Sequence, residues 1–231
     1  MKTIGLIGGT SWISTVEYYR IINTIVNDKL GGLHSAKIIL YSINFSEFKE
    51  MLDSYDWRGI YELIGTAAQK LKDAGADCIV ICANTPHKVA DDLRKAIEIP
   101  LIHIAEATAE AIRKKHLKRV GLLGTQFVME ESFFKDKLSD QGIEAIVPPS
   151  QDRNFIHSTI FNELGKNIFS EETKNAYLRL IRYLIETQGV QGMVFACTEI
   201  PLLIRPEECP VPVFDTTLIH ARAAAEFALP A

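Results

Sequence analysis

Short apolar runs alternate with longer amphipathic stretches along the whole chain. Such runs, rich in Ile, Leu and Val, are typical of parallel strands that are buried on both faces, and the stretches between them are typical of crossover helices. The pattern therefore predicts an α/β protein with mostly parallel sheets. We expect strands at 4–7, 38–42, 78–81, 120–123 and 193–196, and weaker ones at 101–104, 145–147 and 211–214.

The amphipathic stretches predict helices between these strands. In the segment 58–74, for example, Ile60, Ile64 and Leu71 recur near the spacing of a buried helical stripe. The expected helices are 13–29, 58–74, 86–96, 105–115, 130–141, 153–164, 171–188 and 218–227.

One strand-turn-helix pattern occurs twice, as Gly-Leu-Ile-Gly-Gly-Thr at 5–10 and as Gly-Leu-Leu-Gly-Thr at 121–125. Each turn follows a predicted parallel strand, and the carboxyl ends of such strands are where open α/β sheets bind ligands. The 231 residues are also enough for two lobes. We therefore expect two similar Rossmann-like lobes with the active site in the cleft between them. The expected boundaries are a first lobe at 1–100, a second at 101–215, and a last helix at 216–231 that packs back on the first lobe.

Composition excludes several classes of protein. A net charge of −4 and the absence of a long basic run argue against nucleic-acid binding. No apolar stretch approaches the ~18 residues that span a bilayer, and the N-terminal residues lack a signal-peptide core, so we expect a cytoplasmic protein without a membrane partner. The four cysteines favour buried or reactive thiols over disulfides, and they lack a zinc-binding spacing. We expect no metal site.

Cys197 is the first candidate for chemistry, because it follows an apolar run and precedes a predicted helix start. Backbone N–H groups and the helix dipole at such a position favour the thiolate, which could act as a base or a nucleophile. The alternative is a buried cysteine that acts as a small hydrophobic side chain.

Other strand ends carry polar side chains. Asn84 and Thr85 could bind a carboxylate or simply cap a helix, and the same choice applies to Thr125. Thr10 and Ser11 follow two glycines, where a backbone can approach a ligand closely. The dinucleotide fingerprint and the Walker lysine are both absent, so a nucleotide cofactor is disfavoured.

Two further residue types have structural interpretations. Asp215 follows the last predicted strand, and we expect it to cap the last helix. The six histidines show neither metal spacing nor a hydrolase motif, so we expect surface or satisfied core positions for them.

Taken together, these motifs resemble the aspartate/glutamate racemase family, in their order and across nearly the whole chain. The motifs are Gly8-Gly9-Thr10-Ser11-Trp12, Asn84-Thr85-Pro86-His87, Gly124-Thr125 and Cys197-Thr198-Glu199, together with the segments 14–20, 31–35 and 213–216. The resemblance implies an isomerase of amino-acid metabolism that works without pyridoxal phosphate or any other cofactor, as a cytoplasmic homodimer. It also implies two cysteines on opposite faces of the substrate's α-carbon, one removing a proton and the other delivering one.

By this resemblance Cys197 is the second cysteine, and Ala83 stands where the first should be. An alanine methyl group cannot carry a proton, so three alternatives remain for the opposite face. In the first, Cys82 turns towards the substrate. In the second, a water or another acid such as Glu199 supplies the proton. The third is a one-sided enzyme, because the related arylmalonate decarboxylases keep only the second cysteine. A catalytically silent binder of amino acids or other carboxylates is a further hypothesis.

The resemblance also implies the residues that bind a small amino-acid or dicarboxylate substrate. Hydroxyl and amide groups would hold its α-carboxylate or amino group, from Thr10, Ser11, Asn84, Thr85, Thr125 and Thr198. A dicarboxylic amino acid also needs a cation for its side chain. Lys166 and Arg153 are the candidates, and the alternative for both is an ordinary solvated surface charge.

Overall fold

The computed structural model describes residues 1–230 and divides the chain into two compact units. Unit 1 comprises Met1–Ile104 and the residues from His220 onward, and unit 2 is Ala105–Ile219. The last helix, α11 (Thr216–Ala228), therefore begins in unit 2 and ends in unit 1. Ala231, the final residue of the segment expected to pack back, lies outside the described residues.

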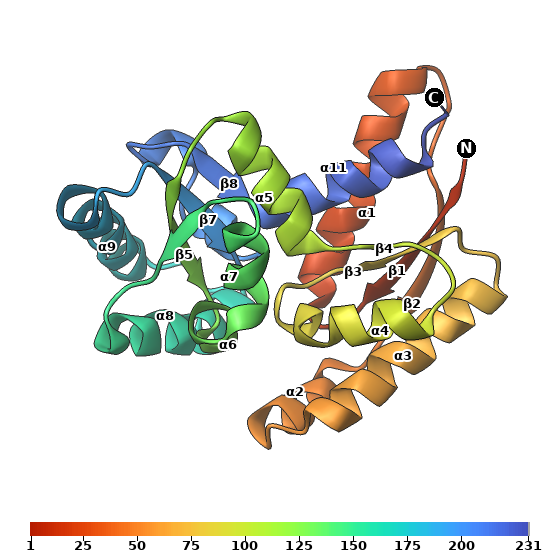
Figure 1. Cartoon of the computed structure of the whole chain (residues 1–231), viewed down its shortest axis with the longest axis horizontal. Coiled ribbons are helices and arrows are strands. Elements are labelled where there is room, and N and C mark those ends of the chain that lie inside the picture. Colours follow the sequence, from red (N-terminus) through yellow and green to blue (C-terminus); the bar gives the residue numbers. More distant parts are fainter. Residues whose placement is uncertain (231) are drawn as a thin grey trace. The chain divides into compact units, whose positions relative to one another are not determined.

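Unit 1 is built on a four-stranded sheet with the order β2-β1-β3-β4, in which every pair is parallel. Figure 1 shows this sheet with helices on both of its faces. In chain order its elements are β1 (Thr3–Gly8), α1 (Trp12–Leu30), β2 (Lys37–Ser42), α2 (Phe45–Asp53), α3 (Trp57–Asp73), β3 (Cys78–Ile81), the 3₁₀ helix η1 (Thr85–Val89), α4 (Ala90–Ala96) and β4 (Leu101–Ile102).

Side-chain alternation divides the core of unit 1 between the two faces of its sheet. Leu6 and Val80 belong to a buried cluster with Tyr18 of α1 and Ala224 of α11, so α1 and α11 cover one face. The opposite face is covered by α3, whose buried stripe is formed by Ile60, Ile64, Ala67, Ala68 and Leu71.

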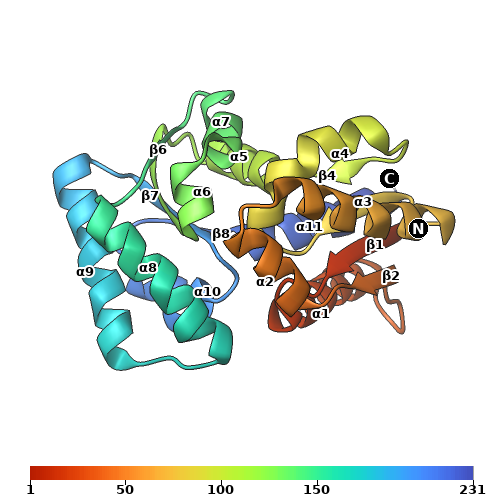
Figure 2. The ribbon, with the colours of Figure 1, turned by 90° about the horizontal axis from the view of Figure 1, so that it is seen from below.

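Unit 2 repeats this plan with a second all-parallel sheet of order β6-β5-β7-β8. The helices α8 and α9 lie side by side and pack against β5 (Figure 2). Its elements are α5 (Ile104–Lys114), β5 (Arg119–Gly124), α6 (Gln126–Glu130), α7 (Ser132–Ser139), β6 (Glu144–Ile146), α8 (Ser150–Asn162), the 3₁₀ helix η2 (Leu164–Lys166), α9 (Glu171–Gln188), β7 (Gly192–Ala196), α10 (Ile200–Leu203), the 3₁₀ helix η3 (Pro206–Glu208) and β8 (Val213–Asp215).

The predicted α/β class with parallel sheets is confirmed. Three local predictions were wrong. The helix α2 was not predicted, because its buried side is only Phe48 and Leu52 and a stripe of two residues is a weak signal. The expected helix 86–96 is a 3₁₀ turn followed by α4, and the expected helix 130–141 is interrupted at Glu131, whose backbone is extended.

Candidate functional site

In unit 1, the loop that follows β1 brings backbone and hydroxyl groups close together. Gly9 has φ +92°, and a Cβ there would lie 2.0 Å from the Ile43 carbonyl oxygen, so only glycine fits. Its N–H donates to Thr15 Oγ1 at 2.9 Å. Ser11 caps α1 by accepting from Ser14 N. Thr10 is 8% exposed, and among the described residues its Oγ1 has no hydrogen-bond partner.

A hydrogen bond joins this loop to the end of the neighbouring strand β3. Ser14 Oγ donates to the Cys82 carbonyl at 2.8 Å. Asn84 and Thr85 follow directly and are both buried, at the carboxyl edge of the sheet. The structure thus brings the four predicted polar residues of unit 1 to one edge, on adjacent strand ends: Thr10, Ser11, Asn84 and Thr85.

Cys82 was considered as a proton donor to the substrate, but it lies on the face of the sheet that α1 and α11 cover. Its side chain is fully buried in the same cluster as Val80, against α1 and α11. Its Sγ donates at 3.9 Å to the Val80 carbonyl, and burial raises the pKa of the thiol far above its usual range. A thiol held in this core is not placed to supply a proton at the strand end.

The register of the two sheets identifies the residue that corresponds to Cys197. Ile7 pairs with Ile81 in unit 1, and Leu123, at the same place in the repeated Gly-Leu-x-Gly motif, pairs with Phe195 in unit 2. Two residues further along, Ala83 in unit 1 therefore corresponds to Cys197 in unit 2. This correspondence is independent of any family pattern.

In unit 2, Cys197 and Glu199 form a hydrogen-bonded pair just beyond the end of β7. The Cys197 Sγ donates to Glu199 Oε2 at 3.0 Å, and Thr198 Oγ1 donates to the same oxygen at 2.7 Å. Cys197 is 7% exposed and Glu199 is 6% exposed. The cysteine continues the buried face that contains Phe195, and it is the residue of that face nearest the carboxyl edge.

This environment corrects the expectation of a thiolate at Cys197. Burial raises the pKa of the thiol well above its usual value, and the negative charge and hydrogen bond of Glu199 raise it further. The backbone N–H groups of Glu199 and Ile200 lower the pKa, as the sequence predicted, but they are outweighed. The helix that follows, α10, has only four residues. Cys197 is therefore a neutral thiol whose proton points at a carboxylate.

Two further hydroxyls lie at the carboxyl edge of the second sheet. Thr125 follows β5 and caps α6 by accepting from Val128 N. The other is Thr217, at the start of α11.

Asp215 accepts from the N–H groups of Thr217 and Leu218, so its predicted capping role is confirmed. Thr217 itself was missed, because a threonine in a first helical turn has no distinct sequence signal. It is 4% exposed, and within residues 1–230 its Oγ1 has no hydrogen-bond partner.

The two cations considered for a side-chain carboxylate differ in their surroundings. Arg153 donates from Nε to Glu130 Oε1 and from Nη1 to the Pro148 carbonyl, both at 2.8 Å, so a structural interaction already engages it. Lys166 is exposed at the end of η2, and its role stays a prediction.

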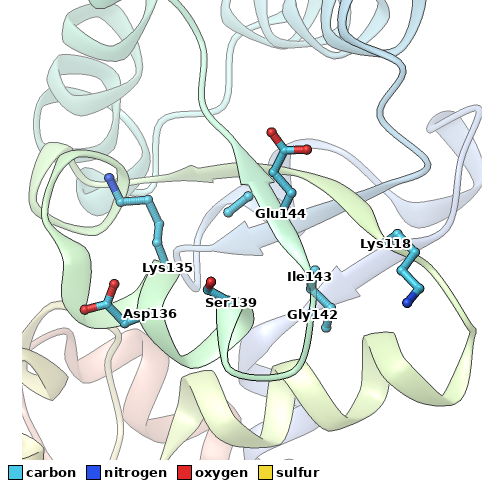
Figure 3. Close-up of a pocket in the computed structure, with 8 residues that line it drawn as sticks. Lys118, Lys135, Asp136, Ser139, Gly142, Ile143 and Glu144 are labelled. Carbon is cyan, nitrogen blue, oxygen red and sulfur yellow. The ribbon is translucent and has the colours of Figure 1, made fainter.

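A hollow of about 560 Å³ in unit 2 lies away from all of these residues. Figure 3 shows its lining near α7 and β6, with Lys118 and Glu144 at the amino ends of β5 and β6. It is therefore at the sheet edge opposite to the one where parallel sheets bind ligands.

Within the described part of the chain, no group of three or more His, Cys, Asp or Glu residues is arranged to hold a metal ion, and no helix is both long and apolar enough to cross a membrane.

The model of the Asp/Glu/Hydantoin racemase family matches residues 7–224. The chain belongs to this family. A solved structure from Yersinia pestis that is assigned to the Asp/Glu racemases is 51% identical, covers all of both chains and has a TM-score of 0.93. An aspartate racemase homologue from Pyrococcus horikoshii OT3 is 36% identical, covers 99% of both chains and has a TM-score of 0.86. Glutamate racemase from Aquifex aeolicus is 27% identical over 60% of this chain, and the match spans 52% of that protein.

Proposed function

We propose that this member of the racemase family is a cofactor-independent enzyme that moves a proton at the α-carbon of aspartate or glutamate. The observation that carries the proposal is the Cys197–Glu199 pair at the carboxyl end of β7. A thiol and a carboxylate that share one proton can act as an acid or, after the proton shifts, as a base.

In the forward step the Cys197 proton passes to Glu199 Oε2, and the resulting thiolate removes the α-hydrogen. The electron pair of the Cα–H bond moves into the substrate carboxyl group, which becomes an enediolate. Hydroxyl and amide donors would stabilise this charge. Thr10 is suited to this role in unit 1, because its buried hydroxyl lacks a hydrogen-bond partner among residues 1–230. Thr125 and Thr198 are candidates in unit 2.

Reprotonation from the opposite face needs a second acid, which Ala83 cannot provide. We propose that a water supplies this proton, so inversion is slow compared with loss and return of the proton on the Cys197 side. The homodimer, the cytoplasmic location and the role of Lys166 remain predictions that follow from the resemblance.

Incubation of each enantiomer of aspartate and glutamate in D₂O tests the proposal. We expect one enantiomer to gain deuterium at the α-carbon faster than it inverts. Cys197→Ala abolishes the exchange, while Cys209→Ala, the matched control in the same unit, leaves it unchanged. Ala83→Cys raises the inversion rate by about tenfold or more, in the range of acid-base catalysis by one positioned group. Absence of exchange in both the natural chain and Ala83→Cys would overturn the proposal.

Ala83 also favours a second candidate, a decarboxylase with one thiol. In that reaction carbon dioxide leaves a disubstituted malonate, and the Cys197 S–H protonates the remaining enediolate. Release of carbon dioxide from an arylmalonate, without deuterium exchange into aspartate or glutamate, would favour this candidate.

A further inference from the structure

His87 is a buried histidine with both ring nitrogens engaged by backbone groups. Its side chain is 1% exposed. Its Nδ1 lies 2.7 Å from the Ala83 carbonyl oxygen, and its Nε2 lies 3.2 Å from the Ile104 amide nitrogen. A carbonyl can only accept and an amide N–H can only donate, so Nδ1 carries the proton and Nε2 is bare. The two contacts specify one neutral tautomer.

The surroundings of His87 keep the ring neutral. The rings of His103 and His220 lie 4.8 and 5.4 Å from it, centroid to centroid. Burial lowers the pKa of His87 well below its usual value, and those two histidines lower it further.

His220 is held in the same way, by groups from other elements. Tyr18 of α1 donates to His220 Nδ1, and His220 Nε2 donates to the Ile102 carbonyl of β4, both at 2.8 Å. These contacts link α1, α11 and the end of β4 through the His220 ring, which lies beside the His87 ring.

The Ala83 carbonyl matters because it belongs to the peptide group that precedes Asn84. A peptide is planar and trans, so the direction of a carbonyl also sets the direction of the following N–H, which points the opposite way. By holding the Ala83 oxygen, His87 sets the orientation of the Asn84 N–H and of the chain that enters Thr85. Ala83 is also the residue that corresponds to Cys197 in the sheet register.

We propose that His87 is a positioning residue for the site at the end of β3, acting through the Ala83 carbonyl rather than by contact with the substrate. This inference rests on the proposed function, since it assigns Asn84 and Thr85 to substrate binding. A histidine that only filled the core would stabilise the fold through its volume. Loss of its hydrogen bond to Ala83 would then affect activity no more than loss of its hydrogen bond to Ile104.

Two substitutions separate these cases. In His87→Asn the side-chain amide nitrogen can occupy the place of Nδ1 and still donate to the Ala83 carbonyl. In His87→Gln the amide reaches the place of Nε2, so the bond to Ile104 can persist while the bond to Ala83 is lost. Both variants lose the ring, so they form a matched pair.

We expect His87→Gln to lower kcat/KM for deuterium exchange by about tenfold or more, and to raise KM, as loss of a binding orientation should. His87→Asn stays within about threefold of the natural chain. Thermal unfolding of both variants controls for stability. Equal losses of exchange in the two variants, or losses that follow their melting temperatures, would overturn the inference.

A second readout does not depend on activity. In ¹⁵N NMR spectra His87 should show a protonated Nδ1 at neutral pH, and the Asn84 and Thr85 amide resonances should move in His87→Gln but not in His87→Asn. A protonated Nε2 or unmoved amides would contradict the positioning role. If neither the natural chain nor Ala83→Cys shows any exchange, the proposed function fails, while these spectra still decide the role of His87.

Discussion

At Cys197, burial and a neighbouring carboxylate oppose the backbone N–H groups at the start of α10. The result is a thiol whose pKa is raised and which donates a hydrogen bond to Glu199 Oε2. The charge of Glu199 therefore holds the pKa of this thiol above the value that burial alone would give.

Glu199→Gln tests this coupling. The substitution removes a negative charge, so the pKa of Cys197 should fall, although burial still holds it above the usual value. At a pH near 8 we expect alkylation of Cys197 by iodoacetamide to become about tenfold faster for each pKa unit that is removed. The alkylated residue is identified by mass spectrometry, with Cys197→Ala as the blank and Glu199→Asp as the charge-preserving control. An unchanged or slower rate in Glu199→Gln would show that Glu199 does not set the thiol pKa.

The sequence identified Cys197 and Glu199 as candidate residues, but it did not predict that the Cys197 thiol is neutral. Cys197 was expected to favour the thiolate from its place after a strand. The opposing charge comes from a side chain only two residues away, but its direction depends on how the chain turns after β7. Likewise, the resemblance placed Ala83 where the first cysteine should be but left open whether Cys82 could turn towards the substrate. The sheet register agrees with this place for Ala83, and Cys82 is buried in the cluster against α1 and α11.

Among the elements, the loop between β1 and α1 has the backbone conformation that most strictly requires a glycine. Gly9 combines a positive φ with close contact to the Ile43 backbone. Gly75 offers a matched comparison in the same unit, because it has the same φ of +92° and a Cβ there would meet nothing within 4 Å.

We predict different costs for alanine at these two glycines. Gly75→Ala should lower the free energy of unfolding by about 1–2 kcal/mol, the cost of a left-handed backbone for a residue with a Cβ. Gly9→Ala should cost a further 1–3 kcal/mol or so, because the added methyl group must displace the backbone near Ile43. Urea unfolding followed by circular dichroism measures both values. Equal losses in the two variants would show that the contact at Gly9 relaxes at little cost.

Elements with many periodic positions were predictable, and short ones were not. The helix α9 coincides with the predicted 171–188, because its buried stripe runs over several turns. The helix α2 and the interruption at Glu131 escaped prediction because each depends on one or two residues. A signal of that size cannot be distinguished from chance in an 11–18-residue window.

For the molecule as a whole, two buried histidines of unit 1 make stability depend on pH. Burial lowers the pKa of His220 to about 3 and that of His87 well below its usual value. Between these values and about pH 6.5 the unfolded chain binds protons that the folded chain excludes. Stability is therefore complete above about pH 6.5 and is lost as the pH falls.

We predict that the free energy of unfolding decreases between about pH 6.5 and about pH 5, by about 1.4 kcal/mol per pH unit for each histidine. Urea titrations at several pH values measure this slope. His220→Gln should reduce it by the share of one histidine, because the Gln amide can still donate to the Ile102 carbonyl but does not titrate. Glu208, whose pKa is lowered to about 2 mainly by the hydrogen bond from Lys174, stabilises above about pH 4.5 and loses its effect only as the pH falls towards 2, outside this window. A flat stability curve would contradict the prediction.

The sequence alone determined the α/β class, the parallel sheets, the polar residues at the strand ends and the family of this protein. These follow from local periodicity and from motifs that are continuous in the chain. The tertiary structure decided which face Cys82 occupies, that Cys197 keeps its proton, and that His87 holds the Ala83 carbonyl. Exposure, pKa and hydrogen-bond geometry depend on groups from several elements that only folding brings together, so a linear pattern does not contain them.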